Sequence, residues 1–260
     1  MNNHEIDFQL YGDDMQFVEV ELDPQETVVA EGGSLMMMDS DISMETIFGD
    51  GSSNQGGLVG KLLGAGKRVI TGESLFMTTF TNQGTGKKHV SFASPYPGKI
   101  VPMDLSELNG KIICQKDAFL AAAKGVAVGV EFQRKMGTGF FGGEGFIMQK
   151  LEGDGMAFVH AGGTIHKREL QPGEKLRVDT GCLVAMTGDV EYNIEYVGGI
   201  KTALFGGEGI FFATLSGPGT VWVQSLPFSR LASKVFAALP EKGGNKGEGG
   251  IGGVFDLFNK

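Results

Sequence analysis

One short motif occurs three times in this chain of 260 residues, and the repetition limits the fold more than any other feature. A Gly-Glu pair followed by an apolar run occurs at Gly72–Met77, Gly143–Met148 and Gly207–Phe212, so the copies start 71 and then 64 residues apart. Self-similarity of this kind marks one supersecondary unit per copy. Three copies in one chain therefore predict three similar substructures around a shared core.

The similarity extends upstream of the motif. The segment Pro24–Leu35 aligns without gaps on Pro172–Leu183, and Asn109–Phe119 is a looser middle copy. Gly98–Leu105 also resembles Gly163–Leu170. We therefore expect residues 1–240 to form a single domain, with repeats at about 5–97, 98–162 and 163–226.

Each repeat predicts the same order of strands. The alternation in Phe17–Leu22 is typical of a strand with one solvated face. An apolar strand follows in every copy, and a Gly-x-Gly segment later in the copy predicts a tight hairpin. The apolar strands are Leu35–Met38, Ala118–Ala123 and Cys182–Met186, and the turns are Gly84–Gly86, Gly153–Gly155 and Gly217–Gly219. Lys116–Lys124 is rich in alanine, but its place in the repeat predicts a strand rather than a helix.

Two segments of the repeats depart from this strand pattern. The first copy contains extra residues at 50–66 that are rich in Gly, Ser and Asn, which predicts a flexible surface loop. Short helical turns are predicted at Val59–Leu63 and Phe132–Met136.

A helix is predicted near the C-terminus. Apolar residues recur at helical spacing over about 229–239, Ser229 is a candidate N-cap, and Pro240 ends the pattern. An antiparallel array of three β units avoids open edges most simply by closing on itself or by pairing its sheets. The sequence therefore predicts an all-β protein, in which three repeats form a pseudo-threefold β-sandwich or barrel-like body with a short C-terminal helix.

Charge and cysteine content limit the function classes. The formal net charge of −9 works against binding to a phosphate backbone. Cys114 and Cys182 fall at apolar positions of different repeats, which favours buried thiols over a disulfide or a metal pair. The chain starts without a basic and apolar leader, and no apolar run reaches the roughly 18 to 20 residues that span a bilayer. We therefore expect a cytoplasmic protein without a transmembrane segment.

Three stretches together resemble a known family. They are FFGGEGF at 140–146, LFGGEG at 204–209 and QSLPFSRLA at 224–232. The combination resembles a widespread bacterial and archaeal family of uncharacterised proteins, whose eukaryotic relatives are named for altered inheritance of mitochondria. The resemblance covers about residues 5–240.

The resemblance implies a fold and a broad role. The family is similar in fold to the tryptophan RNA-binding attenuation protein, so three β units in one chain would mimic a trimer of that fold. No catalytic residues are defined for the family. Its mitochondrial members are linked to inner-membrane organisation, which implies a scaffold or assembly role for this chain.

The repeated glutamates are the first candidate site. Glu73, Glu144 and Glu208 occupy matching positions and could converge on a threefold axis to hold a hard cation such as Ca²⁺. Like charges that are brought together repel one another unless an ion is present. We therefore favour a simpler interpretation, in which each carboxylate caps backbone N–H groups of a glycine-rich turn.

Two histidines are the second candidate. His89 and His160 lie in different repeats at nearly matching places, and an alignment from the Gly-x-Gly turns matches His160 with Ser91 and Gln224. A cupin-like metal site needs several histidines and a carboxylate facing inward. The sequence has no H-x-H, H-E-x-x-H or G-x-S-x-G motif. We therefore favour surface or hydrogen-bonded histidines and expect no cofactor.

The tail at 241–260 is the third candidate, and we predict that it is flexible. Residues 241–250 are mostly Gly, Lys, Glu and Asn, a composition that cannot bury a core. An apolar cluster then ends the chain, formed by Ile251, Val254, Phe255, Leu257 and Phe258. Such a cluster suits docking to a partner protein, a second subunit or a membrane surface. It equally suits a terminal element that folds back onto the body.

Three functional hypotheses follow. The leading one is a non-enzymatic scaffold or protein-interaction protein, because the threefold repetition brings no convergent catalytic groups. The second is a β-barrel that binds a metal or a small ligand, with or without enzymatic activity. The third is RNA binding, which rests on the fold relative alone and is disfavoured by the acidic charge.

Overall fold

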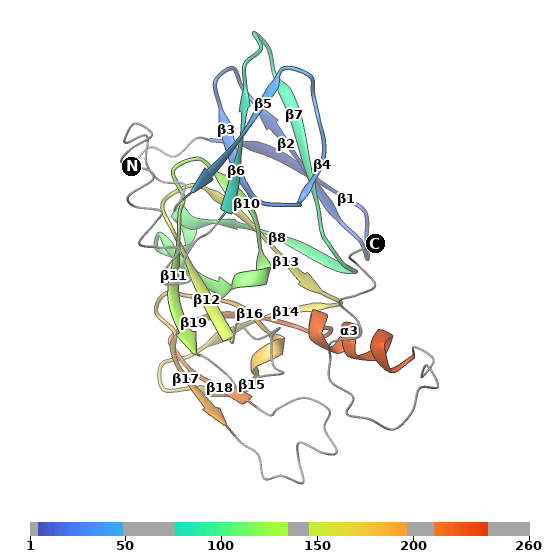
Figure 1. Ribbon diagram of the computed structural model, residues 1–260. Helices are drawn as coiled ribbons and strands as arrows, with labels where there is room; N and C mark the ends of the chain where they lie inside the picture. Colours follow the sequence, from blue (N-terminus) through green and yellow to red (C-terminus); the bar gives the residue numbers. More distant parts are fainter. Residues whose placement is uncertain (1–4, 49–75, 135–145, 197–210, 239–260) are drawn as a thin grey trace.

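The computed structural model describes residues 5–48, 76–134, 146–196 and 211–238, which consist mainly of antiparallel β-strands (Figure 1). These ranges contain one α-helix, α3 (Phe228–Ala237), near the end of the described chain. The predicted all-β class with a short C-terminal helix is therefore confirmed. In the described residues, no helix combines the length and the apolar character that a membrane crossing requires.

The strands fall into three consecutive segments, which we call units 1, 2 and 3. Unit 1 contains β1 (Asp7–Tyr11), β2 (Phe17–Leu22), β3 (Thr27–Glu31), β4 (Leu35–Met38), β5 (Ile42–Phe48), β6 (Phe76–Asn82) and β7 (Lys88–Ala93). Unit 2 contains β8 (Gly98–Asp104), η1 (Leu105–Leu108), β9 (Lys111–Gln115), η2 (Lys116–Ala118), β10 (Phe119–Ala123), β11 (Ala127–Arg134), β12 (Phe146–Glu152) and β13 (Met156–Gly162). Unit 3 contains β14 (Ile165–Leu170), β15 (Lys175–Asp179), η4 (Thr180–Cys182), β16 (Leu183–Thr187), β17 (Glu191–Tyr196), β18 (Phe211–Ser216) and β19 (Gly219–Gln224).

The strand pairings recur from unit to unit. With β1 set aside, the first strand of each unit pairs with the sixth, the second with the fifth, the third with the sixth, and the fourth with the fifth. These antiparallel pairs are β2–β7, β3–β6, β4–β7 and β5–β6, then β8–β13, β9–β12, β10–β13 and β11–β12, then β14–β19, β15–β18, β16–β19 and β17–β18. The pairings do not establish an arrangement of the units about a threefold axis, which stays a prediction.

Two further pairings join the units, and we call them the first and second junctions. In the first junction β3 of unit 1 pairs with β10 of unit 2, and in the second β9 of unit 2 pairs with β16 of unit 3. The second strand of one unit thus lies beside the third strand of the next. The junctions fuse smaller sheets into two six-stranded sheets, β5-β6-β3-β10-β13-β8 and β11-β12-β9-β16-β19-β14.

The hydrophobic core continues across the junctions. One cluster packs Val20 and Phe80 of unit 1 against Leu120 and Phe158 of unit 2. A second cluster combines buried residues of all three units, from Val29 in β3 to Trp222 in β19. Because apolar burial is the main favourable contribution to folding, the shared clusters make the units depend on one another for stability.

The described strands do not close into a ring. Among them, β4 pairs only with β7, and β15 pairs only with β18. Figure 1 shows β4 in the upper part of the molecule and β15 at the lower end. The expectation that the array closes or pairs to avoid open edges is therefore not met, since each of the four described sheets has two end strands, β4 and β15 among them.

The three Gly-x-Gly segments do not form the predicted hairpins. The strands that they connect, β6 and β7, β12 and β13, and β18 and β19, lie in different sheets and do not pair with each other. Each segment instead carries the chain from one sheet of a unit to the other. Glycine is required at Gly219 because its φ is +144° and a Cβ there would lie 2.5 Å from Cγ2 of Val190.

Local predictions in unit 2 had mixed outcomes. The alanine-rich segment forms a short 3-10 helix, η2, followed by the predicted strand β10. The helical turn predicted at Phe132–Met136 is wrong over Phe132–Arg134, which belongs to β11 because pairing with β12 overrides local propensity. The loop at 50–66, including the turn predicted at Val59–Leu63, lies outside the described residues.

The predicted helix is confirmed, but its start is not. It begins at Phe228, and its N-cap is Pro227, which makes no side-chain capping bond. The proposed cap, Ser229, is therefore wrong, because it lies inside the first turn. Pro240, the predicted stop, is beyond the described chain.

Replacing Phe158 tests whether units 1 and 2 share one core. Phe158 is fully buried and makes an edge-to-face contact with Phe8 at 5.0 Å. We expect Phe158→Ala to lower the free energy of unfolding by about 3–5 kcal/mol in urea denaturation. The control Val235→Ala, on the exposed face of α3, should change it by less than about 0.5 kcal/mol. Equal small effects of both substitutions would contradict the shared core.

Candidate functional site

Several candidates from the sequence cannot be compared with the structure. Glu73, Glu144 and Glu208 lie outside the described residues, as does the apolar end of the tail, formed by Ile251, Val254, Phe255, Leu257 and Phe258. Their convergence on an axis, their capping role and the docking or folding back of the tail all stay predictions.

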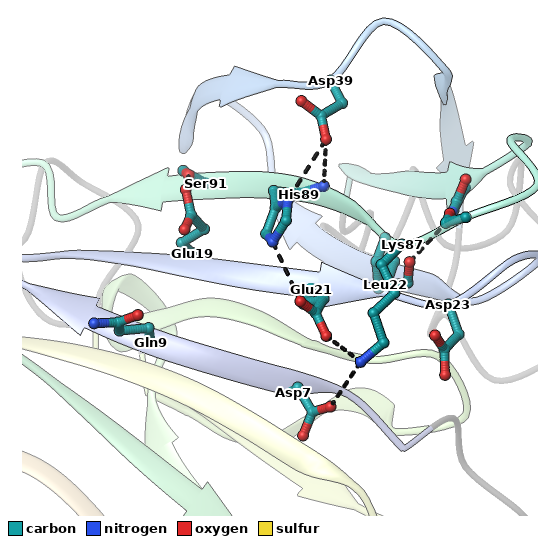
Figure 2. A network of polar contacts seen from close by, with 12 residues as sticks. Asp7, Gln9, Glu19, Glu21, Leu22, Asp23, Asp39, Lys87, His89 and Ser91 are labelled. Atoms are coloured by element: carbon teal, nitrogen blue, oxygen red, sulfur yellow. Dashed lines mark hydrogen bonds and ion pairs between the residues drawn. The ribbon is translucent and has the colours of Figure 1, made fainter.

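His89 lies on an exposed polar face of unit 1 (Figure 2). Its Nε2 is 3.4 Å from a carboxylate oxygen of Glu21, and its Nδ1 is 3.6 Å from one of Asp39. The same Asp39 carboxylate accepts a hydrogen bond from the backbone N–H of His89 at 2.8 Å. Lys87 pairs with Glu21 and extends the network to Asp7. Since every side chain except the half-buried Glu21 is well exposed, the network is a solvated surface cluster that contributes modestly to stability.

His160 has a different environment, because it is buried in β13. Its ring contacts the ring of Tyr96 edge to face at 4.9 Å, and it hydrogen-bonds the backbone of Asp117. Burial lowers the pKa of His160 from 6.5 to about 4, so the imidazole is neutral at physiological pH. His89 and His160 have no partner in common, and the structure gives no support to a shared metal site.

The sheet register corrects the sequence alignment of His160. In the sheets, His160 pairs with Ile100, and Gln224 pairs with Ile165. In each unit, the residue just before this histidine or glutamine pairs with the first residue of the third strand, β10 or β16. By the same rule their counterpart in unit 1 is Ala93, two residues beyond Ser91. The predicted match of His160 with Gln224 is confirmed, whereas the match with Ser91 is wrong.

The comparison with Gln224 explains why Nδ1 of His160 has no hydrogen-bond partner. Gln224 donates to the backbone carbonyl of Gly181 and accepts from the backbone N–H of Gly162. His160 makes the first of these bonds at the equivalent Asp117, but its buried Nδ1 has no partner. The position of Gly162 corresponds to Pro95 when counted from the end of β7 and to Pro97 when counted back from β8, and neither proline has an N–H to donate.

Glu31 is the second unusual group at the first junction. Burial and the nearby Asp117 carboxylate raise the pKa of Glu31 from 4.5 to about 7, against the opposing effect of Lys116. At the second junction the equivalent residue is Gln115, whose amide donates to the backbone carbonyl of Thr180. A protonated Glu31 matches Gln115 in shape and also offers a donor. We therefore interpret Glu31 as a structural group of the junction.

Two observations concern the reactive groups of the described residues. Burial raises the pKa of the Cys114 thiol to about 12, so the thiolate that a nucleophile requires is not formed at neutral pH. In the described ranges no group of three or more His, Cys, Asp or Glu side chains could hold a metal ion.

An acidic groove of about 1000 Å³ lies between unit 1 and unit 2. Its carboxylates come from both units, namely Glu5, Asp7, Glu21, Asp23, Glu26, Asp104 and Asp154. The concentration of negative charge repels anionic ligands, including a phosphate backbone.

Among the described strands, β4 is the apolar strand whose side chains are most exposed. Met36, Met37 and Met38 are 47%, 47% and 40% exposed. The equivalent residues of β10 and β16 are at most 1% exposed, namely Leu120, Ala121, Ala122, Val184, Ala185 and Met186. Sequence reasoning recognised β4 as a strand but missed its exposure. The signal that could have found it is the order of the three repeats, because each internal junction takes its second strand from the preceding repeat and neither of the other two repeats precedes unit 1.

Comparison with known proteins finds a matching family, a related sequence and a related structure. Residues 8–226 match the sequence profile of a family described as mitochondrial biogenesis AIM24. An uncharacterized protein of Streptococcus pyogenes serotype M6 is 32% identical over 232 residues, which cover 87% of this chain and 88% of that protein. A crystal structure of a protein from Streptococcus pyogenes has a TM-score of 0.70 at 25% identity and covers 90% of this chain and 100% of its own.

The substitution Glu31→Gln tests the origin of the raised pKa. Between pH 4.5 and 7 the folded state holds a proton on Glu31 that the unfolded state has released, so this contribution to stability is full below pH 4.5 and is lost as the pH rises through 7. A glutamine at position 31 does not titrate, so the variant loses no stability from this position as the pH rises. Relative to the wild type, the variant should therefore gain about 3 kcal/mol of unfolding free energy between pH 4.5 and 7.5.

Urea denaturation at several pH values measures this difference. Glu45→Gln, which removes a charge from an exposed position of β5, is the control and should follow the wild type. A pH-independent difference between Glu31→Gln and the wild type would show that Glu31 titrates normally.

Proposed function

The chain belongs to the mitochondrial biogenesis AIM24 family, and from this premise we propose that it is a non-enzymatic assembly protein that binds another polypeptide along the open edge of β4. The observation that carries the proposal is the exposure of three consecutive methionines on a strand whose counterparts in units 2 and 3 are buried. An apolar strand at a sheet edge is a template for the addition of a further strand.

The chemistry of the edge suits this type of recognition. An edge strand offers backbone donors and acceptors on its unpaired side, and an extended segment of a partner satisfies them while its side chains add specificity. Methionine is unbranched and adaptable, which makes it common at protein-binding surfaces. Fully burying a methionine contributes about 1.5–3 kcal/mol relative to full exposure, so half-exposed methionines gain part of this amount on docking.

The other described features agree better with assembly than with catalysis or nucleic-acid binding. Burial is the main cause of each strongly shifted pKa value, at Glu31, Tyr96, Cys114 and His160, so packing accounts for all four. The acidic groove and the net charge of −9 disfavour RNA.

We also propose a reducing compartment, the cytoplasm, for this chain. Cys114 is a buried thiol that forms no disulfide, as expected where thiols are kept reduced. Cell fractionation measures this directly: recovery with cytoplasmic marker proteins supports the proposal, and recovery with membranes or in the medium contradicts it.

The substitution Met37→Lys tests the role of the β4 edge. A lysine in the middle of the strand places a charge where the partner would pack, so we expect at least about tenfold weaker association. The measurement is affinity purification of the tagged chain from its native cells, with quantitative mass spectrometry of what is retained. Met15→Lys is the matched control, because Met15 is 61% exposed and lies outside the named strands.

The expected result is a polypeptide, a second copy of the chain included, that is retained at a fixed ratio by the wild type and by Met15→Lys but lost from Met37→Lys. Retention of the same polypeptides by both variants would show that the β4 edge is not the binding surface.

A further inference from the structure

We propose that the partner of the β4 edge is β15 of a second copy of this chain, paired antiparallel with Met37 opposite Val178 and Met38 opposite Arg177. The inference deepens the proposed function and rests on it, because it names the partner of the same edge. The pairing would be a third junction, made between molecules, on the pattern of the two junctions inside each chain.

The repeated register supports this pairing. In the first junction Ala30 lies opposite Ala121, and in the second Cys114 lies opposite Ala185. Ala30 and Cys114 are the fourth residues of β3 and β9, and the fourth residue of β15 is Val178.

The equivalent of Ala121 and Ala185 in unit 1 is defined by a shared irregularity. The third strand of each unit, β4, β10 or β16, has one register shift between its first and its third residue. In β4 this shift lies between Leu35 and Met37. The residue after the shift is Ala121, Ala185 or Met37. The two repeated pairs therefore predict Met37 opposite Val178 without any adjustable offset.

The two strands of this third junction, β4 and β15, are the ones that the linear order of the units leaves without a junction partner. Each internal junction joins a second strand to the third strand of the next unit. Three units in one chain leave the third strand of unit 1 and the second strand of unit 3 without such a partner in the described structure. The edges therefore complement each other and not themselves.

Exposure distinguishes β4 from its counterparts. The methionines of β4 are 40–47% exposed, against at most 1% for their counterparts inside the junctions. In β15, Val178 is buried at 9% exposure and Leu176 is partly buried, and both pack in a hydrophobic cluster. The equivalent residues of β3 and β9 are completely buried, namely Val28, Ala30, Ile112 and Cys114. The loss of cover relative to the internal junctions is thus large at β4 and small at β15.

The geometry favours a contact between molecules. Figure 1 shows β4 and β15 at opposite ends of the chain, with the two six-stranded sheets between them. A contact between two different surfaces of identical molecules is heterologous, so it produces a closed ring or an open filament. The number of copies follows from the rotation between neighbours and is an outcome of the experiment.

Arg177 is the one departure from the apolar pattern. It replaces Val29 of β3 and Ile113 of β9, and its guanidinium lies 5.0 Å from the centre of the Phe212 ring. A charge on an edge strand opposes indiscriminate pairing. Opposite Met38, its aliphatic stem can pack on the methionine while the charged end stays in solvent.

Site-specific disulfide formation tests the register. Two full-length proteins, Met38→Cys and Arg177→Cys, each in a Cys182→Ser background, are mixed and oxidised mildly. Both positions are exposed, so neither substitution disturbs a core. We expect a disulfide-linked dimer of one Met38→Cys chain and one Arg177→Cys chain, at several-fold higher yield than either protein alone gives.

The matched control replaces Arg177→Cys by Lys175→Cys. Lys175 is exposed on the same strand and the same face but lies two residues away, so its yield should be several-fold lower. Equal yields for positions 175 and 177, or a dominant dimer of two Met38→Cys chains, would overturn the register. A disulfide within one chain carrying both Met38→Cys and Arg177→Cys would overturn the role of the second copy.

Charge reversal tests whether the contact drives assembly. Met38→Lys places like charges opposite each other and should shift light-scattering masses of the full chain towards the monomer. Adding Arg177→Asp should restore association, because the pair is then attractive. Circular dichroism confirms that each variant is folded. Failure of the double variant to recover would overturn the proposal.

The outcomes separate this inference from the proposed function. A wild type that stays monomeric at all concentrations and gives no mixed disulfide overturns the second copy as partner, while loss of a different polypeptide from Met37→Lys would still support the assembly role. Loss of association on replacing Phe255 and Phe258 by aspartate, without the disulfide, would identify the tail as the occupant of β4 and overturn the inference.

Discussion

The structure depends on one interaction, the antiparallel pairing of the second strand of a unit with the third strand of the next. Ala30 opposite Ala121 and Cys114 opposite Ala185 are fully buried, and the small side chains leave room for larger apolar residues from the surrounding strands. The junctions fuse four small sheets into two six-stranded ones and let the hydrophobic clusters extend over unit boundaries. Polar groups at the junctions follow the same logic, since His160 repeats a bond that Gln224 makes, and a neutral Glu31 stands where Gln115 stands in the next junction.

The same interaction also explains where the molecule is open. A linear chain of units must leave one junction strand unmatched at each end, and the described strands leave β4 and β15 in this position. Burial explains the strongly shifted pKa values, whereas the methionines of β4, like Phe228, Val235 and Phe236 on α3, are apolar side chains that packing among the described residues leaves exposed. Our proposal of an assembly role for this member of the AIM24 family is based on that exposure, and our choice of a second copy as the partner is based on the repeated register.

Much of the fold could be predicted from the sequence, because repetition is a property of the sequence itself. The strands β4, β10 and β16 were recognised from matched apolar runs, and the repeat corrected the helical propensity of the alanines in β10. The Gly-x-Gly turns were placed correctly, but their strands were paired wrongly, because glycine indicates a change of direction and not which strand is the neighbour. The alignment of His160 with Ser91 is wrong because the connection between the fifth and sixth strands is longer in unit 1 than in unit 2. It runs over seven positions from Thr81 to Lys88, and over three from the equivalent Glu152 to Gly155. The exposure of β4 depends on which strand is absent beside it, and a local pattern contains no information about that.

The most direct measurement is amide hydrogen exchange on the wild-type chain over a wide range of protein concentration. The account predicts that amides of 35–38 and 175–179 become protected together as the concentration rises, because they meet across one interface. Amides of 28–30 and 112–114, inside the existing junctions, should be protected at every concentration. Protection of only one of the two edges, or exchange at both that is independent of concentration, would contradict the claim that β4 and β15 are the two halves of a third junction.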